Sequence, residues 1–305
     1  MSCERIGQRE EHLVNYRKTL PWLAVVACLT TACGAATGTT TASPPVTTTS
    51  GSSTAPTASS LSEDQNKALV LRLYSEAFNQ DKTDVVKELA GTNYVQHDTS
   101  VPAGADGQIK LFSDIKAKIP GAVATVKHTA ADGDLVAVHW QASATPDKET
   151  TGEAIVDLYR VAGGKLVEHW DAVQQVPATT ASGNSLFSDV YRYPNGAPTI
   201  SEAQEETNKQ FAVNAYRTLF SGDLTILDKA WDPLYFQHNP QAGNGAAELK
   251  KMLQGAPAGG TAPRFANTLA DGDLVWVFGA DLPAVDIFRV ANGKIVEHWD
   301  VIGGR

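Results

Sequence analysis

The stretch GKLVEHWDAV at residues 164–173 returns almost unchanged as GKIVEHWDVI at residues 293–302. Each copy follows a related run, VDLYRVAG at 156–163 and VDIFRVAN at 285–292. Within each copy, two runs that alternate apolar and polar residues are joined by a turn containing glycine, which is the pattern of a β-hairpin. The sequence therefore predicts the same two-stranded unit twice.

The repeat extends well beyond this hairpin. YVQHD at 94–98 matches YFQHN at 235–239, and TAADGDLVAV at 129–138 matches TLADGDLVWV at 268–277 at eight of ten positions. The copies are 141 residues apart at the Gln-His pair and 129 apart at the Glu-His-Trp-Asp run. One module is therefore duplicated, and its second copy lacks about ten residues between the last two blocks.

Each module is expected to begin with helices. The segment 62–79 starts with a Ser cap and acidic residues and continues with apolar residues at helical spacing. These apolar residues are Ala68, Leu71, Leu73, Ala77 and Phe78. Two shorter helices are expected at 83–90 and 107–119, the second ending before Pro120. Helices followed by an antiparallel meander are typical of the α+β class.

The N-terminal part resembles a bacterial lipoprotein signal. Arg17 and Lys18 precede the apolar stretch LPWLAVVACLTTA, which is too short to cross a bilayer. Small residues lead to Cys33, which is the expected lipidation site, and Cys28 remains the alternative. This signal predicts an exported protein that is held at the cell membrane by a lipid anchor, outside the cytoplasm.

The rest of the chain divides by composition. Residues 34–60 are nearly all Thr, Ser, Ala, Pro and Gly, so they cannot bury enough apolar surface to offset the entropy of ordering. We therefore expect a signal peptide at 1–33 and a disordered tether at 34–60. A first module at 61–178, a linker at 179–200 and a second module at 201–305 follow.

Charge and cysteine content exclude several functions. The net charge of −9 and the lack of a basic cluster argue against a nucleic-acid partner, because phosphate binding needs basic patches. The three cysteines, Cys3, Cys28 and Cys33, all precede the tether. We therefore expect no disulfide, no thiolate nucleophile and no cysteine-based metal site in the folded part.

Together these motifs resemble the SnoaL-like polyketide cyclase branch of the nuclear transport factor 2 superfamily. The resemblance rests on Y-x-Q-H-[DN], D-G-D-L-V, VD-[LI]-[YF]-R-V and GK-[LI]-VEHWD, and it covers about 61–178 and 200–303. It implies two cone-shaped modules, each with a curved antiparallel sheet wrapped around helices and a deep apolar pocket. Because this fold hosts isomerases, cyclases, hydrolases and binding proteins, it does not settle the activity.

Strand alternation predicts which side chains face the pocket, because residues two apart share a face. Asp157 and Tyr159 share one face, as do His169 and Asp171, whereas Trp170 lies on the opposite face. Resemblance to ketosteroid isomerase implies that Asp157 lies in the cavity as a proton-bearing hydrogen-bond donor. The candidate catalytic residues are Asp157, His169, Asp98, His97 and Asp171, and the candidate ligand-binding residues are Tyr159, Tyr94, Asp286, His298 and His238.

Structural roles remain open for several of these residues. Asp157 can pair with an arginine, His97 can hydrogen-bond a turn, and Trp170 and Trp299 can pack at a dimer face. A metal held by His97 and Asp98 with His169 and Asp171 would have suitable ligand types. Their spacing matches no local metal-binding motif, so no metal site is predicted.

Three functions fit the sequence. The first is a cofactor-free lyase or isomerase that moves a proton beside the carbonyl of a small apolar compound, by aldol-type or enolate chemistry. The second is a lipid-anchored module that binds a small apolar ligand without turnover. The third is an interaction protein whose two modules form an intramolecular pseudo-dimer. Whether the chain is an enzyme, and what its ligand is, stays open at this point.

Any turnover is expected in the first module. The carboxylate of Asp98 can accept a proton, whereas the amide of Asn239 at the same position cannot. The shorter hairpin of the second copy is also expected to lower one wall of its pocket. The resemblance then implies Asp98 or His169 as the base and Asp157 as the oxyanion partner.

Overall fold

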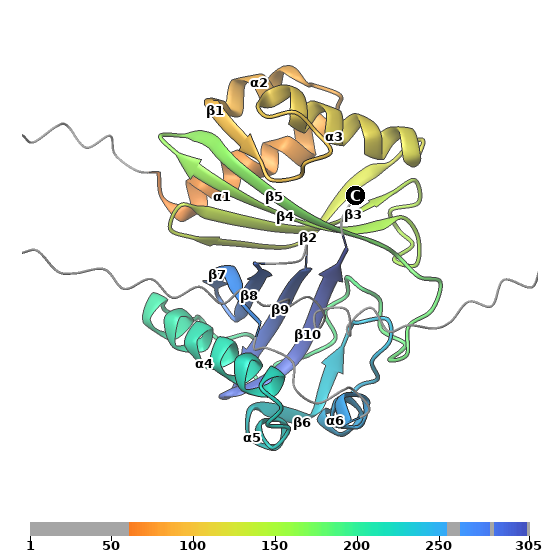
Figure 1. Cartoon of the computed structure of the whole chain (residues 1–305), viewed down its shortest axis with the longest axis vertical. Coiled ribbons are helices and arrows are strands. Elements are labelled where there is room, and N and C mark those ends of the chain that lie inside the picture. Colours follow the sequence, from red (N-terminus) through yellow and green to blue (C-terminus); the bar gives the residue numbers. More distant parts are fainter. Residues whose placement is uncertain (1–60, 255–262, 281–283, 304–305) are drawn as a thin grey trace, which may run out of the picture.

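The computed structural model describes residues 61–254, 263–280 and 284–303. The expected signal peptide, Cys33 and the tether lie outside these residues. In the part that is described, no helix is both long enough and apolar enough to span a membrane. This part forms two modules, each built from a five-stranded sheet with helices packed on one face (Figure 1).

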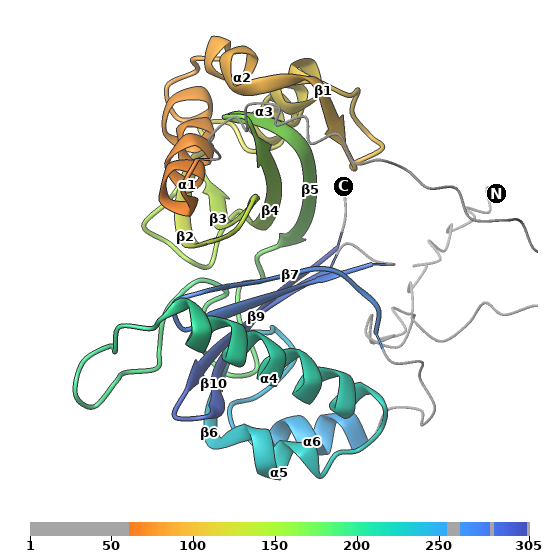
Figure 2. The same cartoon turned by 90° about the vertical axis from the view of Figure 1, so that its left-hand side faces the viewer.

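The first module runs from α1 to β5. Its elements are α1 (Glu63–Arg72), the π-helical segment η2 (Leu73–Phe78), α2 (Asp84–Leu89), β1 (Ala90–Gln96), α3 (Ala105–Lys118), β2 (Val123–Asp132), β3 (Leu135–Ser143), β4 (Glu153–Ala162) and β5 (Lys165–Gln175). The strand order is β1-β5-β4-β3-β2. The helices cover the inner face of this curved sheet, and its outer face is turned toward the second module (Figures 1 and 2).

The second module repeats this topology. Its elements are α4 (Glu202–Phe220), α5 (Ile226–Ala230), β6 (Trp231–Gln237), α6 (Ala246–Gln254), β7 (Phe265–Asp271), β8 (Leu274–Gly279), β9 (Ala284–Ala291) and β10 (Lys294–Ile302). The strand order β6-β10-β9-β8-β7 is that of the first sheet. The α+β class with two modules of one fold is confirmed. The β8–β9 connection, residues 280–283, is shorter than the β3–β4 connection, residues 144–152, as the spacing of the repeats indicates.

The expected meander is only part of each sheet. Strands β2 to β5 are antiparallel neighbours, but β1 joins the edge of β5 in parallel. Strand β6 pairs with β10 in the same way. A parallel pair needs a long crossover, and the whole of α3 and the meander supplies it. This pairing places the residues that follow β1 and β6 next to the Glu-His-Trp-Asp strands.

The first helix begins as predicted. Ser62 and Gln65 form a capping box, in which each side chain accepts a hydrogen bond from the backbone of the other residue. The buried face differs in detail from the expected one, because Ala68 is exposed while Val70 and Tyr74 are buried. Val70 and Tyr74 are one helical turn apart and share a side, whereas Ala68 lies on the opposite side.

The two sheets pack against each other through their outer faces (Figure 2). One apolar cluster joins both modules and the linker. It includes Val156, Leu158 and Ala172 from the first sheet, Leu186 and Phe187 from the linker, and Trp276, Ile287, Trp299 and Val301 from the second sheet. Trp299 is fully buried in this cluster, in agreement with the packing role that the sequence left open for it.

Two ion pairs cross between the modules in a reciprocal way. Lys67 of the first module pairs with Asp271 of the second, and Lys209 of the second pairs with Asp132 of the first. Lys67 and Lys209 lie on the first helix of their modules, and both aspartates end the strand before the Asp-Gly-Asp turn. A contact in which residue i meets j and j meets i is the form of a two-fold interface.

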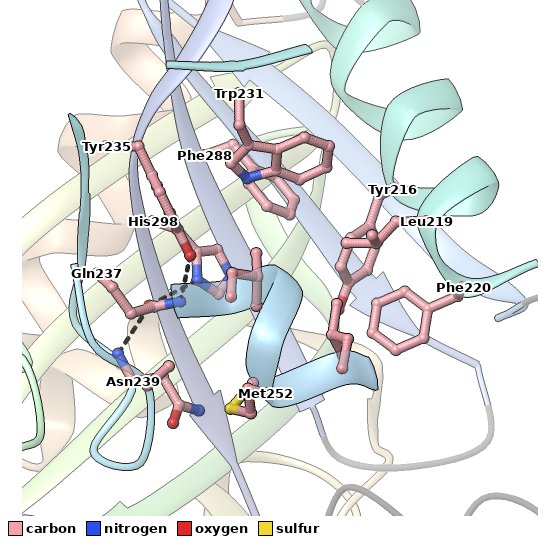
Figure 3. A pocket seen from close by; sticks show the side chains of 13 residues that line it. Tyr216, Leu219, Phe220, Trp231, Tyr235, Gln237, Asn239, Met252, Phe288 and His298 are labelled. Carbon is pink, nitrogen blue, oxygen red and sulfur yellow. Dashed lines mark hydrogen bonds between the residues drawn. The ribbon is translucent and has the colours of Figure 1, made fainter. Parts of the chain in front are cut away.

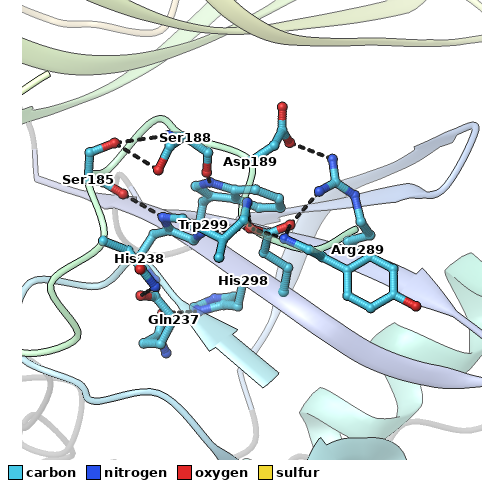
Figure 4. A network of polar contacts seen from close by, with 12 residues as sticks. Ser185, Ser188, Asp189, Gln237, His238, Arg289, His298 and Trp299 are labelled. Atoms are coloured by element: carbon cyan, nitrogen blue, oxygen red, sulfur yellow. Dashed lines mark hydrogen bonds and ion pairs between the residues drawn. The ribbon is translucent and has the colours of Figure 1, made fainter. Parts of the chain in front are cut away.

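Linker residues 185–191 lie on the outer face of β10 (Figure 4). The Glu297 side chain, which is fully buried, accepts hydrogen bonds from the backbone N–H groups of Val190 and Tyr191. His238 Nε2 lies 3.0 Å from the same carboxylate, and Arg289 forms an ion pair with it. The linker therefore completes the surroundings of a buried charge, and is an integral part of the second module.

His128 and His139 form a buried pair between the modules. Their Nδ1 atoms are 3.0 Å apart, and His139 has no exposed surface. Burial, together with the nearby His128 and His238, holds the pKa of His139 well below its ordinary value. The folded chain therefore keeps this imidazole neutral at a pH where the unfolded chain would protonate it.

We expect acid to destabilise the fold through His139. Below pH of about 6.5 the unfolded chain binds a proton at this residue that the folded chain does not bind, so this contribution to stability is lost as the pH falls. His139→Phe should weaken that pH dependence, because the second module has Phe278 at the matching position. Urea unfolding of both proteins at pH of about 7.5 and about 5.5 measures it. An equal loss of stability in both proteins would assign the effect to other groups.

Candidate functional site

Asp157 on β4 lies at the centre of the inner face of the first module. Tyr74 donates a hydrogen bond to Asp157 Oδ2 at 2.5 Å, and Trp140 Nε1 donates to the same oxygen at 2.7 Å. His169 Nε2 lies 3.1 Å from the other oxygen. Asp157 is 4% exposed, so these three side chains provide nearly all of its surroundings.

This environment differs from the expected one. Two side-chain donors meet Oδ2 of Asp157, so this oxygen accepts hydrogen bonds from the protein itself and is not free to meet a ligand. In the described part of the chain, no arginine pairs with it either. Asp157 thus contacts Tyr74, Trp140 and His169, and its catalytic role stays a prediction.

Aromatic rings fill the interior of the first module. Trp140 lies edge-on to Tyr74 and to Phe78, with ring centroids 5.3 Å apart in both pairs. Phe78 lies edge-on to Phe112 at 5.2 Å. These rings lie between β3 and the helices, where the family resemblance implies a pocket.

Other predicted residues of the first module do gather on this inner face. Tyr159 stacks on His169 with 4.7 Å between ring centroids, and the hydroxyl of Tyr94 donates to Gln108 Oε1 at 2.8 Å. Asp171 is half-buried on β5. Burial is the main cause that raises the pKa of Tyr159, and the charge of Asp157 and, less strongly, that of Asp171 add to it. The sequence therefore identified the correct face.

His97 and His238 lie on the outer face instead. His97 stacks on Trp170 at 4.3 Å between ring centroids and lies 3.6 Å from Glu168. Its counterpart His238 lies 3.0 Å from Glu297, under the linker. The glutamine before each histidine faces inward, so the histidine, one residue later in an extended chain, faces outward. Neither histidine is placed for the catalytic or ligand-binding role expected of it.

Asp98 and Asn239 occupy equivalent turns but form different hydrogen bonds. Asp98 Oδ1 accepts a hydrogen bond from the backbone of Ser100 at 2.7 Å, and Asn239 Oδ1 accepts one from Gln241 at 2.8 Å. Asn239 Nδ2 also donates to Asp300 Oδ2 at 2.7 Å. An aspartate cannot make this second contact when it is ionised. The amide of the second module therefore positions a neighbouring carboxylate.

The second module repeats the central carboxylate with one donor fewer. Tyr216 donates to Asp286 Oδ2 at 2.8 Å, and His298 Nε2 lies 3.0 Å from Asp286 Oδ1. The residue that matches Trp140 along the aligned strands is Gly279. The second module therefore lacks both the indole N–H and the ring at this position.

Gln237 determines which nitrogen of His298 carries a proton. Gln237 Oε1 accepts hydrogen bonds from the backbone N–H groups of His238 and Asn239, both at 2.9 Å. This atom is therefore an oxygen that accepts, and His298 Nδ1, 2.9 Å away, must donate to it. His298 Nε2 is left to face Asp286.

Asp300 completes the polar end of the second module. It is 1% exposed, and burial raises its pKa to about 6, against the lowering effect of His298. Its Oδ1 atom has no hydrogen-bond partner among the described residues. Asp286, His298 and Asp300 each present one possible metal-ligand atom, and these atoms lie within 4.8 Å of one another.

A pocket opens beside this polar end (Figure 3). The enclosed part of this space is about 30 Å³, and it reaches about 380 Å³ only when the open solvent at its mouth is counted. Aromatic and aliphatic side chains from α4, β6, α6 and β9 form most of its wall, and Gln237, Asn239 and His298 form its polar part. The lining residues are Tyr216, Leu219, Phe220, Trp231, Tyr235, Gln237, Asn239, Ala242, Leu249, Met252, Leu253, Phe288 and His298. The pocket thus lies in the module opposite to the one expected to be active.

Two differences between the copies accompany the pocket. Gly279 in place of Trp140 removes a ring from the interior, and Leu249 in place of Gln108 removes the acceptor of a tyrosine hydroxyl. The hydroxyl of Tyr235 accepts a hydrogen bond from the side chain of Gln237 at 2.7 Å. In the described part of the chain, its own hydroxyl proton has no acceptor. Sequence reasoning missed both differences, although the alignment of the two copies contains them.

Part of this chain is similar to known proteins. Residues 68–181 match the family model described as SnoaL-like polyketide cyclase. No curated protein matches the sequence. Wild-type IdmH from Streptomyces antibioticus is 26% identical over 36% of this chain and 91% of its own, with a TM-score of 0.30. A candidate polyketide cyclase from Bacillus cereus ATCC 10987 is 18% identical over 37% and 78%, with a TM-score of 0.33.

The family match and the architecture agree. The matched residues span the first module, and the second module has the same strand order and the same helices on the inner face of its sheet. Together they support a SnoaL-like fold for the first module, and the second module shares its architecture.

Proposed function

We propose that the second module binds a small, mostly apolar molecule that carries a carbonyl oxygen. The observation that carries this proposal is the pocket, whose apolar wall ends at a small set of polar groups. A few convergent polar groups in an apolar hollow are typical of small-molecule sites. The first module, whose interior is filled by aromatic rings, has a supporting role.

Tyr235 is the group that recognises the carbonyl. Its hydroxyl is held by Gln237 through an accepted hydrogen bond, so its proton is directed elsewhere. Burial raises the pKa of Tyr235 far above neutral pH, so the hydroxyl stays a donor. A ligand carbonyl at the pocket wall would accept this proton. The matching Tyr94 is not available, because it donates to Gln108.

A second candidate function is proton transfer beside that carbonyl. The supporting observation is Asp300, a buried carboxylate with one unpartnered oxygen and one oxygen held by Asn239. Asn239 lines the pocket, so this carboxylate lies directly behind the pocket wall. A base and a hydroxyl donor are the parts that enolate chemistry needs. This places the proposed chemistry in the second module, with Asp300 in the role expected of Asp98 or His169.

The location of the protein is part of the proposal. The sequence of the N-terminal part supports export, a lipid on Cys33 and a tether that leaves the folded modules outside the cytoplasm. The reciprocal ion pairs and the shared apolar cluster support an intramolecular pseudo-dimer. Detergent partitioning of the full chain beside its Cys33→Ala variant tests the anchor, and equal partitioning would shift the assignment to Cys28.

The ligand proposal predicts a loss of ketone binding in Tyr235→Phe. One hydrogen bond contributes about 0.5–1.5 kcal/mol, so affinity for 2-tetralone should fall about 2- to 12-fold. Affinity for the matching hydrocarbon, tetralin, should not change. Tyr94→Phe in the first module is the matched control and should bind both compounds like the original chain. Equal affinity for ketone and hydrocarbon in every variant would contradict the proposal.

The same samples separate binding from turnover. Exchange of the protons beside the carbonyl of 2-tetralone in D₂O can be followed by NMR with and without the protein. Asp300→Asn should slow a protein-catalysed exchange about 10²- to 10⁴-fold, the usual effect of removing a proton-transfer group. Binding without any catalysed exchange would leave the binding function and remove the catalytic one.

A further inference from the structure

The pocket of the second module ends at three groups that together offer a cation site. Asp286, His298 and Asp300 lie on the inner faces of β9 and β10. They are 7%, 5% and 1% exposed, respectively. One oxygen or nitrogen of each lies within 4.8 Å of the others. Imidazole nitrogens and carboxylate oxygens that lie this close together can bind one metal ion.

The hydrogen bonds leave the nitrogen of His298 that faces the cluster available as a ligand. Because Gln237 Oε1 accepts from two backbone N–H groups, it also accepts from His298 Nδ1. In the neutral imidazole, Nε2 then has a lone pair and faces Asp286 Oδ1 at 3.0 Å. Two acceptors at this distance need a proton or a cation between them. A hydrogen bond on the far ring nitrogen is also the usual second contact of a metal-bound histidine.

The charges of two buried carboxylates also favour a bound cation. Asp286 and Asp300 are buried carboxylates, and in the residues that the structure describes neither forms an ion pair with lysine or arginine. Asp300 Oδ1 has no partner, while Asp300 Oδ2 is held by Asn239. Buried carboxylates are paired or coordinate metals, because an isolated buried charge is costly.

The first module supplies an internal comparison. Asp157, His169 and Asp171 occupy the same strand positions. There, Trp140 donates to Asp157 beside Tyr74, so the oxygen has two donors. Among the described residues, the geometric group of three is found in the second module and not in the first. The modules differ here in two side chains, because Gly279 replaces Trp140 and Asn239, which holds Asp300, replaces Asp98.

We propose that Asp286, His298 and Asp300 bind one divalent transition-metal ion at the polar end of the second pocket. One imidazole and two carboxylates suit Zn²⁺ and Mn²⁺, and three protein ligands leave a coordination position open. Asn239 and Gln237 orient two of the ligands. This inference does not depend on the ligand proposal, but a bound ion makes Asp300 a ligand and so excludes its role as a base.

The test uses the full chain, freed of metal with a chelator and titrated with MnCl₂ and with ZnCl₂ by calorimetry. Mn²⁺ is informative because thiolates bind it poorly, so the N-terminal cysteines do not interfere. About one ion per chain should bind. Asp300→Asn should weaken Mn²⁺ binding at least about 10-fold, and the matched Asp171→Asn in the first module should not. No uptake of either metal, or equal binding by the two variants, would overturn the proposal.

A second variant protects the test against misfolding. Gly279→Trp introduces the indole that the first module carries, and it should also abolish Mn²⁺ binding while the far-ultraviolet circular dichroism stays native. Unchanged Mn²⁺ binding by folded Gly279→Trp would count against the site. Ketone binding with no metal uptake would contradict this inference alone, and metal uptake with no ketone binding would contradict only the proposed function.

Discussion

Gly279→Trp should abolish ligand binding by the second module. In the first module the tryptophan at this position fills the interior, where its ring lies 5.3 Å from those of Tyr74 and Phe78. The same side chain at Gly279 would occupy the hollow lined by Tyr216 and Phe220. A ligand that buries about 150 Å² of apolar surface gains about 3–4 kcal/mol from it. Affinity for 2-tetralone should therefore fall about 100-fold or more.

The reciprocal variant, Trp140→Gly, tests whether removing the tryptophan opens a binding site in the first module. Removing a buried tryptophan leaves a cavity and costs about 3–5 kcal/mol of stability. It also removes one donor from Asp157. The variant should be less stable and should gain an apolar site in the first module, which calorimetry with tetralin would detect. A Gly279→Trp protein that still binds 2-tetralone with the original affinity would show that the ligand lies elsewhere.

Glu297→Gln should destabilise the protein by about 3–5 kcal/mol, the cost of breaking a buried ion pair. Glu297 is fully buried, and it accepts two backbone hydrogen bonds from the linker besides its pair with Arg289. The amide cannot balance the arginine charge, and its NH₂ group cannot accept the linker N–H groups. The free energy of unfolding from urea titration measures the effect.

Glu168→Gln is the matched control for this prediction. Glu168 holds the same place in the first copy of the repeated motif, but it is partly exposed. It lies 3.6 Å from His97 and 3.7 Å from Arg160, as surface ion pairs do. Its loss should cost less than about 1 kcal/mol. Similar losses in both variants would mean that the linker contacts contribute little to stability.

Much of the fold follows from local patterns in the sequence. The duplication, the Ser62 cap and the hairpins around the two glycine-containing turns are visible as letters and spacings. Alternation along β4 and β5 correctly separates Asp157 and His169 from Trp170. These features are predictable because a period of two, or of three to four, depends only on neighbouring residues.

Contacts between distant segments determined the site. The residues around Trp140 in the sequence do not indicate that its ring fills the interior of the first module. Those around Gly279 do not indicate a pocket in the second. Each outcome depends on the helices that pack across the sheet. The parallel pairing of β1 and β6 brings Gln96 and Gln237 to the inner histidines, so that His97 and His238, one residue later, face outward against the expectation.

The repeated Glu-His-Trp-Asp run separates most directly what the local sequence determines from what tertiary packing determines. Its two copies have the same letters and the same alternation, so the sequence alone determines that Glu168 and Glu297 lie on outer faces while His169 and His298 lie on inner ones. The linker and the opposing sheet cover one of these outer faces and leave the other partly exposed. The burial of a charge depends on which distant segments pack over it. Two identical local sequences can therefore differ in burial.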